Sequence, residues 1–418
     1  LQGGGGDDSL MGGADGDRRE GGLGADPMPG GLGDDSLLGG DGLDWASYGE
    51  LTASSQGVTV SLATGRATGA AGSDTLSGIE NVVSGAGNDS LLGDGSANVL
   101  DGGLGNDTLQ GGLGNDSLLG RDGLDWVSYA ELTATQSVSV SLTNGSASGA
   151  AGSDQFAGIE NVLGGAGNDT LIGSGSANVL AGGGGNDLLD GGGGADTLTG
   201  DAGNDTLIAD GGSSEDSFAG GADNDLYRAG AVNLTLRIND SGGNDTLSYA
   251  DAAAGSIDAT LLGLVNGIEA IDLGGVGHTL TLDAARVRAL SATTDVLRVH
   301  GSGDDRLVLS GAGWLRGATV DGVLTLTNGS ATIRVDASLA ENLATDGNDT
   351  LNGAAGNDVF DGLGGNDSVR GLGGVDSVVG GNGHDTLSDA EAVAGRLVST
   401  SVASVSGMEA INLGGVGR

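Results

Sequence analysis

The sequence of 418 residues contains no cysteine, no lysine and only two prolines, and aromatic residues make up 2% of it. Without cysteine, neither a disulfide framework nor a thiolate metal site can form. The 15 basic residues, all arginine, stand against 57 acidic ones, and the formal net charge of −42 is opposite to what binding to nucleic acid or to an anionic membrane requires. So few aromatic residues also leave little material for a core of large side chains.

Two further absences concern location. No run of 18 apolar residues occurs, so the sequence predicts no transmembrane segment. The chain begins Leu1-Gln2-Gly3, without an initiator methionine or a secretory leader. We therefore expect an internal segment of a longer protein, cut at both ends.

Glycine is abundant, with 90 residues, and recurs together with aspartate at a period of nine. The unit 102–110 reads G-G-x-G-N-D-x-L-x. Its glycines permit the positive φ of a tight turn and let carbonyl oxygens point inward at an ion, and its aspartate adds a short carboxylate. The leucine at the eighth position stands between polar or small residues, which predicts a three-residue strand with one inward side chain.

Nine residues thus make one turn and one strand, and two units make one coil of a two-sheet solenoid. A single unit cannot bury its leucine or complete a coordination shell, so neighbouring units are needed. Hard oxygen ligands select Ca²⁺ or Mg²⁺ over zinc or copper, and several Ca²⁺ ions are expected as cofactors between the turns. The candidate metal ligands are the aspartates at the sixth position of these units: Asp8, Asp26, Asp35, Asp44, Asp89, Asp107, Asp116, Asp125, Asp169, Asp187, Asp196, Asp205, Asp225, Asp245, Asp349, Asp358, Asp367, Asp376 and Asp385.

These units resemble the RTX (hemolysin-type) calcium-binding repeats of exported bacterial proteins, G-G-x-G-x-D-x-U-x. The resemblance implies that the aspartates and turn carbonyls of successive units share each ion, and that the partners include a type I secretion machinery. Three departures stand out. Asn98 and Asn178 replace aspartate, the unit that starts at Gly12 is scrambled, and Pro27 and Pro29 are expected to interrupt the next strand.

The predicted fold is all-β, with several calcium-bound parallel β-rolls joined by short β modules. The rolls are expected over 1–48, 84–129, 164–231 and 344–388, and the modules between them over 49–83 and 130–163. A β-rich spacer with isolated calcium-type units is expected over 232–343, and the start of a second, truncated copy of that spacer over 389–418. In the first spacer, Asp283 is expected to cap a short helix over 284–290.

A longer repeat of about 80 residues overlies the short one. Asp44-Trp45-Ala46-Ser47-Tyr48 returns at 125–129, and Ile79-Glu80-Asn81-Val82 returns at 159–162. Between these markers, residues 58–62 and 138–142 alternate apolar and polar side chains, as half-buried strands do. The Trp-Tyr pairs could form a platform for stacking carbohydrate, but the capping of a roll where its leucines stop is the favoured interpretation.

The function that follows is a secreted, extracellular or cell-surface repeat region that folds on calcium after export, as a stalk or adhesin segment. The alternative is the repeat portion of an exported enzyme or toxin whose active domain lies outside this chain. No H-E-x-x-H, G-x-S-x-G or Walker motif is present, so no catalytic residue is predicted. Without calcium, the carboxylates repel one another and the chain is expected to behave as an acidic disordered linker. A host ligand is not identifiable from these residues.

Overall fold

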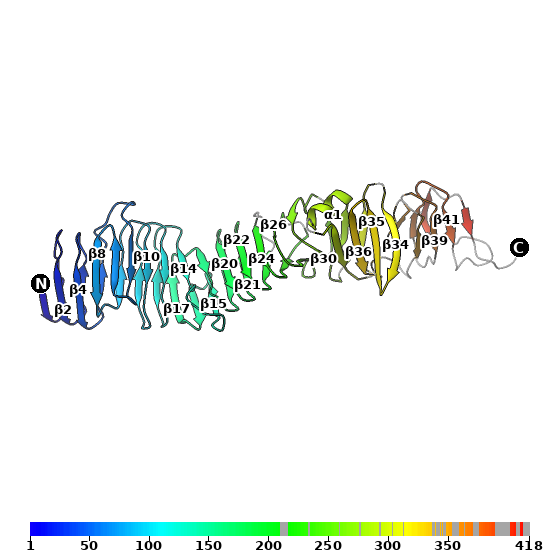
Figure 1. Ribbon diagram of the computed structural model, residues 1–418. Helices are drawn as coiled ribbons and strands as arrows, with labels where there is room; N and C mark the ends of the chain where they lie inside the picture. Colours follow the sequence, from blue (N-terminus) through cyan, green and yellow to red (C-terminus); the bar gives the residue numbers. More distant parts are fainter. Residues whose placement is uncertain are drawn as a thin grey trace. The chain divides into compact units, whose positions relative to one another are not determined.

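The computed structural model describes residues 1–209, 216–232, 235–258, 260–275, 277–291, 294–302, 304–311, 313–336, 339, 343, 345, 348–352, 359–362, 364–370, 376–388, 402–406 and 410–412. Two compact units share the chain, Leu1–Asp225 and Leu226–Arg418. Strands dominate both, and the long parallel sheets confirm the predicted all-β roll (Figure 1). No helix in the described ranges is long and apolar enough to cross a membrane.

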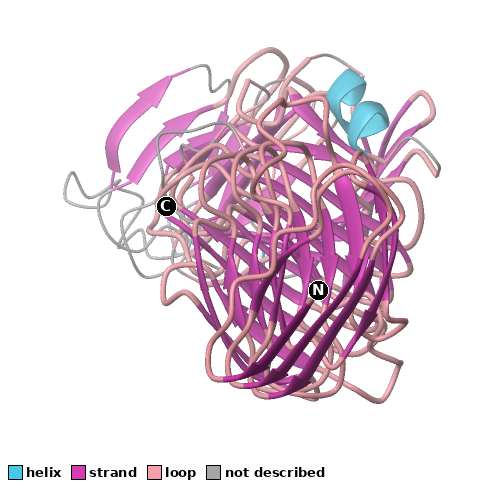
Figure 2. Ribbon diagram, turned by 90° about the vertical axis from the view of Figure 1, so that its left-hand side faces the viewer, coloured by secondary structure: helices cyan, strands magenta, loops and turns pink. Residues whose placement is uncertain are grey.

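The first unit is a solenoid of two sheets, and Figure 2 looks along it from its N-terminal end. Its first sheet contains β1 (Gln2–Gly5), β2 (Arg18–Leu23), β4 (Ser36–Asp41), β8 (Gly72–Ser77), β7 (Arg66–Gly69), β6 (Val58–Ser61), β10 (Ser90–Leu92), β12 (Thr108–Gln110), β14 (Trp126–Ser128), β18 (Asn161–Leu163), β20 (Val179–Gly184), β22 (Thr197–Ala202) and β24 (Ser217–Ala222). Its second sheet contains β3 (Pro27–Pro29), β5 (Trp45–Ser47), β9 (Asn81–Val83), β11 (Val99–Asp101), β13 (Ser117–Leu119), β17 (Gly152–Ala157), β16 (Ser146–Gly149), β15 (Val138–Ser141), β19 (Thr170–Ser174), β21 (Leu188–Gly192) and β23 (Thr206–Ala209).

Strands that neighbour each other in one sheet come from units 18 residues apart. Leu91 of β10 pairs with Leu109 of β12, and Leu100 of β11 pairs with Leu118 of β13 in the opposite sheet. All four leucines are buried, and the residues on either side of each are less buried, as the alternation of the pleat requires. Two nonapeptides therefore form one coil, as the period of nine predicts.

The segments between the arrays do not interrupt the sheets. β6, β7 and β8 form an antiparallel meander that is inserted between parallel neighbours, since β8 pairs with β4 and β6 pairs with β10. In the second sheet, β15, β16 and β17 occupy the same kind of position between β13 and β19. The predicted half-buried strands over 58–62 and 138–142 are β6 and β15 of these meanders.

The expected interruption at Pro27 and Pro29 is wrong. These residues bound strand β3, which pairs in parallel with β5 and buries Met28 completely. Proline is tolerated in a strand where the ladder does not need its N–H. The other neighbour of β3 is the segment 8–13, which forms no strand and offers only the N–H of Leu10 to the Pro27 carbonyl.

The second unit begins with β25 (Leu226–Ala229), which pairs with β27 (Thr246–Ser248). The strands that follow up to residue 336 are β26 (Arg237–Asn239), β28 (Ser256–Ile257), β29 (Leu264–Asn266), β30 (Ala270–Asp272), β31 (Thr279–Leu282), β32 (Val296–His300), β33 (Arg306–Leu309), β34 (Leu315–Val320), β35 (Val323–Asn328) and β36 (Ala331–Asp336). The last three form another antiparallel meander, and β36 pairs in parallel with β32.

Helix α1 (Ala284–Leu290) lies where the sequence predicts it. The side chain of Asp283 accepts a hydrogen bond from the backbone N–H of Arg286 at 2.6 Å and so caps the helix. Val287 and Leu290 are buried, and the helix packs against β29, β32 and β36 (cyan in Figure 2).

Between residues 350 and 388 the described strands again pair at a spacing of 18 residues. One sheet contains β37 (Thr350–Asn352), β39 (Ser368–Arg370), β41 (Thr386–Ser388) and β43 (Ala410–Asn412), and the other contains β38 (Val359–Asp361), β40 (Asp376–Val379) and β42 (Val402–Ser406). Much of the predicted second spacer, 389–418, lies outside the described residues.

Candidate calcium centres

The sixth-position aspartates form a hydrogen-bonded ladder along each edge of the roll. The backbone N–H of Asp89 donates to Oδ1 of Asp107 at 2.8 Å, and the N–H of Asp107 donates to Oδ1 of Asp125 at 2.7 Å. Each carboxylate thus accepts from the coil before it. Asp8 is half-buried, and the following predicted residues are at most 3% exposed: Asp26, Asp35, Asp44, Asp89, Asp107, Asp116, Asp125, Asp169, Asp187, Asp196, Asp205, Asp225, Asp245, Asp349, Asp367 and Asp385.

Two predicted positions cannot be placed in this way. Asp358 lies outside the described residues. Asp376 opens strand β40, and only its backbone position is described.

The second oxygen of these carboxylates is what sets the site apart. Within the described residues, Oδ2 is buried and accepts no hydrogen bond in Asp8, Asp26, Asp44, Asp107, Asp116, Asp125, Asp187 and Asp367. A buried carboxylate oxygen without a donor or a cation carries a large desolvation cost. Its regular recurrence therefore indicates that a cation belongs beside it.

Glycine at the first position makes room beside that oxygen. The place that a Cβ on Gly3 would take lies 2.6 Å from Asp8 Oδ2 and 2.7 Å from the carbonyl oxygen of Gly21 in the next coil. A carboxylate and a carbonyl oxygen therefore converge on a space that only glycine leaves open. Oxygen ligands of this kind bind Ca²⁺ at about 2.3–2.6 Å, so the residues present fit the ion that the repeats imply.

Burial also shifts the titration of these groups. It raises the pKa of Asp107 and of Asp187 to about 7, against the lowering effect of the hydrogen bond from the preceding coil. Neighbouring carboxylates add to the rise, from Asp89 and Asp125 in the case of Asp107. Burial likewise raises the pKa of Asp116 and Asp367 to about 6. The ionised form is disfavoured at each position unless positive charge compensates it.

The fifth position carries a second ladder that runs in the opposite direction. The side-chain oxygen of Asn88 accepts from the N–H of Asn106 at 3.0 Å, and that of Asn106 accepts from the N–H of Leu124 at 2.9 Å. Here the earlier coil supplies the acceptor and the later coil supplies the donor. These asparagines are exposed, so they tie the turns together on the solvent side of the aspartate row.

Sequence reasoning missed several members of the aspartate ladder. Asp74 in the first meander accepts from the N–H of Asp35 at 3.0 Å, and Asp154 in the second accepts from the N–H of Asp116 at 3.0 Å. A signal was present, because 72–77 and 152–157 read G-S-D-x-[LF]-x, which is the second half of a nonapeptide. Glu80 is another member, since its Oε2 accepts from the N–H of Asp44 at 2.9 Å.

The Trp-Tyr markers supply a hydrogen-bond donor to the meanders. The Tyr48 hydroxyl donates to Asp74 Oδ2 at 2.8 Å, and the Tyr129 hydroxyl donates to Asp154 Oδ2 at 2.9 Å. Both tyrosines are buried, so a carbohydrate platform made of the Trp-Tyr pair is not available on this fold. The hydroxyl satisfies the oxygen that elsewhere in the roll has no donor.

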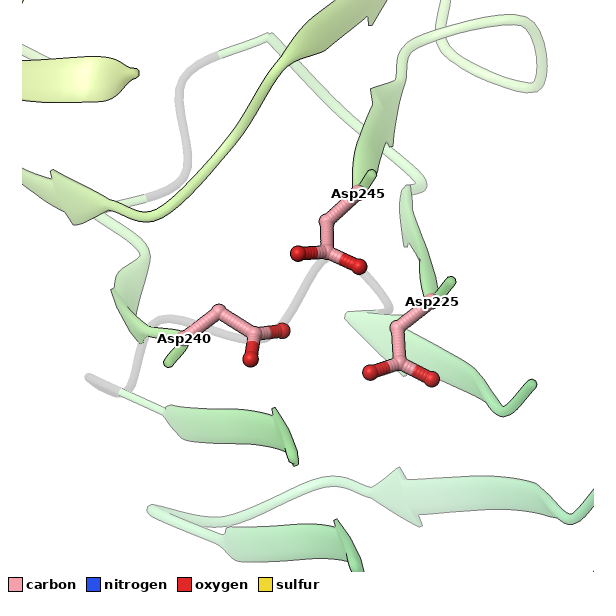
Figure 3. A group of neighbouring side chains, drawn as sticks. All are labelled: Asp225, Asp240 and Asp245. Atoms are coloured by element: carbon pink, nitrogen blue, oxygen red, sulfur yellow. The ribbon is translucent and has the colours of Figure 1, made fainter. Parts of the chain in front are cut away.

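A further pair of carboxylates lies in the second unit. Figure 3 shows the side chains of Asp240 and Asp245 pointing into the same space, with one oxygen of each within 4.8 Å of the other. Asp245 was predicted as a ligand, and Asp240 was not. Asp245 also follows the ladder rule, because its N–H donates to Oε2 of Glu269 at 3.1 Å, as the N–H of Asp44 does to Glu80.

Buried carboxylates, glycine-lined spaces and parallel coils of 18 residues define a calcium-binding β-roll. The profile of the RTX calcium-binding nonapeptide repeat matches residues 68–109, 101–130, 148–189, 172–207, 182–214, 208–233, 343–369 and 356–387. The chain therefore carries RTX, hemolysin-type calcium-binding repeats over these residues. Such repeats bind calcium and are structural, and proteins that carry them are typically exported by type I secretion.

None of the curated proteins matches the chain. Among solved structures, it is similar to the crystal structure of the extracellular lipase LipA from Serratia marcescens, with 15% identity and a TM-score of 0.13. The similarity covers 60% of this chain and 38% of the lipase chain.

Proposed function

We propose that this chain is a structural segment of an extracellular or cell-surface protein, a stalk or adhesin region whose rolls fold when Ca²⁺ binds after export. The observation that carries the proposal is the row of buried Oδ2 atoms, such as those of Asp107 and Asp125, each beside a first-position glycine. Asp107 and its equivalents in the other units would hold the ions, together with the first-position carbonyls of the next coil.

The charge balance supports folding as the calcium-dependent step. A formal net charge of −42 resists compaction, and the folded roll removes many of these carboxylates from water. Ligand binding that occurs only in the folded state supplies folding free energy. Extracellular calcium modules bind at about 10⁻⁴–10⁻³ M, a range that external calcium reaches and cytosolic calcium does not. The chain would stay extended inside the cell and fold outside it.

The continuity of the first unit supports a stalk. Its parallel ladder continues through both meanders, from β4 to β8 and from β13 to β17. At both meanders, the arrays and the intervening segments of this unit therefore share continuous sheets. Continuous sheets of this kind suit a spacer that holds another domain away from a surface.

A calcium titration followed by far-UV circular dichroism tests the proposal, with magnesium as the control ion. We expect a cooperative gain of β signal at submillimolar to millimolar Ca²⁺ and none with Mg²⁺. Small-angle scattering on the same samples should show a radius of gyration that falls as calcium is added. A spectrum that does not respond to calcium would overturn the proposal.

A further inference from the structure

One arginine occupies a place in the roll that belongs to leucine. Arg19 stands at the eighth position of the unit that begins at Gly12, and in the sheet it pairs with Leu37 of the next coil. Its side chain is completely buried, whereas the neighbouring Arg18 has 61% of its side chain exposed. A buried guanidinium is costly unless acceptors surround it.

The oxygens that surround the Arg19 guanidinium belong to the turns of two successive coils. Its Nη1 donates to the carbonyl oxygen of Gly30 at 2.9 Å and to that of Pro29 at 2.6 Å. The same nitrogen lies 3.4 Å from Asp35 Oδ2, and Nη2 lies 3.5 Å from Asp17 Oδ2. Asp17 and Asp35 are sixth-position residues of successive coils, joined by the usual ladder bond of 2.7 Å.

The guanidinium lies in the space that glycine leaves open in the other coils. A Cβ on Gly12 would collide with Nη2 of Arg19 and with Asp17 Oδ2, and the Gly30 carbonyl belongs to the first position of the next coil. At the equivalent space of Gly3 the nearest atoms are Asp8 Oδ2 and the Gly21 carbonyl oxygen. Both spaces are lined by a sixth-position carboxylate oxygen and a first-position carbonyl oxygen of the next coil. At Gly12, the Arg19 guanidinium lies between them.

We propose that the Arg19 guanidinium replaces a calcium ion between the turns of Asp17 and Asp35, so that this turn pair binds no calcium and Arg19→Leu opens a calcium site there. The inference rests on the proposed calcium sites of the other coils. The guanidinium brings one positive charge to the two carboxylates of Asp17 and Asp35, so part of their charge is compensated before calcium arrives. It gives the first array one junction that needs no calcium to close.

Calcium stoichiometry of the full chain tests the inference. Native mass spectrometry in saturating calcium should show one more ion on Arg19→Leu than on the parent chain. Arg18→Leu is the matched control, because it removes the same charge from the adjacent exposed position and should leave the count unchanged. The reciprocal variant Leu109→Arg, which places arginine between Asp107 and Asp125, should lose one ion.

A measurement on the unmodified chain guards against variants that do not fold. In crystals grown with terbium, anomalous density is expected beside Asp107 Oδ2 and none between Asp17 and Asp35. Density between Asp17 and Asp35 in the parent chain, or an unchanged ion count in a folded Arg19→Leu, would overturn the proposed role of Arg19. Either result would leave the proposed calcium sites of the other coils standing. A parent chain that binds no calcium would instead overturn the proposed function.

Discussion

The side-chain amide of Asn98 donates to the backbone carbonyl of Glu80 at 2.7 Å, and Asn178 does the same to Glu160 at 2.6 Å. At this position other units have an aspartate, which accepts from a backbone N–H of the preceding coil. In the peptide group that joins Glu80 to Asn81, the N–H of Asn81 donates back to the Asp44 carbonyl at 3.0 Å, so the Glu80 carbonyl faces the next coil. A donor is required there, and asparagine supplies it where aspartate could not.

We therefore expect Asn98→Asp to destabilise the first unit, although it restores the repeat consensus. The new carboxylate oxygen would face the Glu80 carbonyl, and a buried group left without its partner costs about 1–3 kcal/mol. The measurement is denaturant unfolding in saturating calcium. Asn106→Asp is the control, because an exposed fifth-position oxygen still accepts from Leu124 and its stability should hardly change. Equal stability of both variants would contradict this explanation.

Gly102→Ala should block one calcium site without altering any carboxylate. A Cβ on Gly102 would meet the carboxyl group of Asp107, with its Cγ at 2.9 Å. We expect one bound ion fewer and a higher calcium concentration at the midpoint of folding, both read from a calorimetric titration. Gly95→Ala provides the comparison, since a Cβ there has nothing within 4 Å. If both alanines behave alike, the space beside Asp107 does not hold an ion.

Tyr129→Phe should destabilise the roll at the second meander. Burial raises the pKa of Tyr129, so its hydroxyl stays protonated and donates a hydrogen bond to Asp154 Oδ2 at 2.9 Å. Its removal leaves a buried carboxylate oxygen without a donor, at a cost of about 1–3 kcal/mol. Thermal unfolding in calcium measures the loss. Tyr249→Phe should cost less, because no carboxylate in the described part of the chain accepts from that hydroxyl, and a larger loss there would refute the assignment.

The metal-free chain should become easier to fold as the pH falls. Burial raises the pKa of Asp107 and Asp187 in the folded state to about 7, above the value of about 3.9 in an unfolded chain. The folded state then binds more protons than the unfolded state between these values, so its stability increases from pH 7 down to pH 4. Circular dichroism with a chelator measures this. In saturating calcium the trend should reverse, because protons compete with the ion for the same oxygens.

The period of nine predicts the turn, the strand, the inward leucine and the buried aspartate, because each of these depends only on local residues and on the nearest coil. It does not predict the meanders, since their parallel partners β4 and β10 are far apart in the sequence. For the same reason it misses Asp74 and Glu80, which complete the ladder across long connections. The domain boundaries and the assignment of each aspartate to an ion stay predictions.

Both ladders join residues that lie 18 apart in the sequence, one from an earlier N–H to a later aspartate and one from an earlier asparagine to a later N–H. A deletion of nine residues would transfer every later strand to the opposite sheet and exchange the partners along both edges. A deletion or duplication of eighteen would leave each donor facing the same kind of acceptor. Genes for such rolls can therefore lengthen or shorten by whole coils. The length of the roll can then evolve while the chemistry of each turn stays constant.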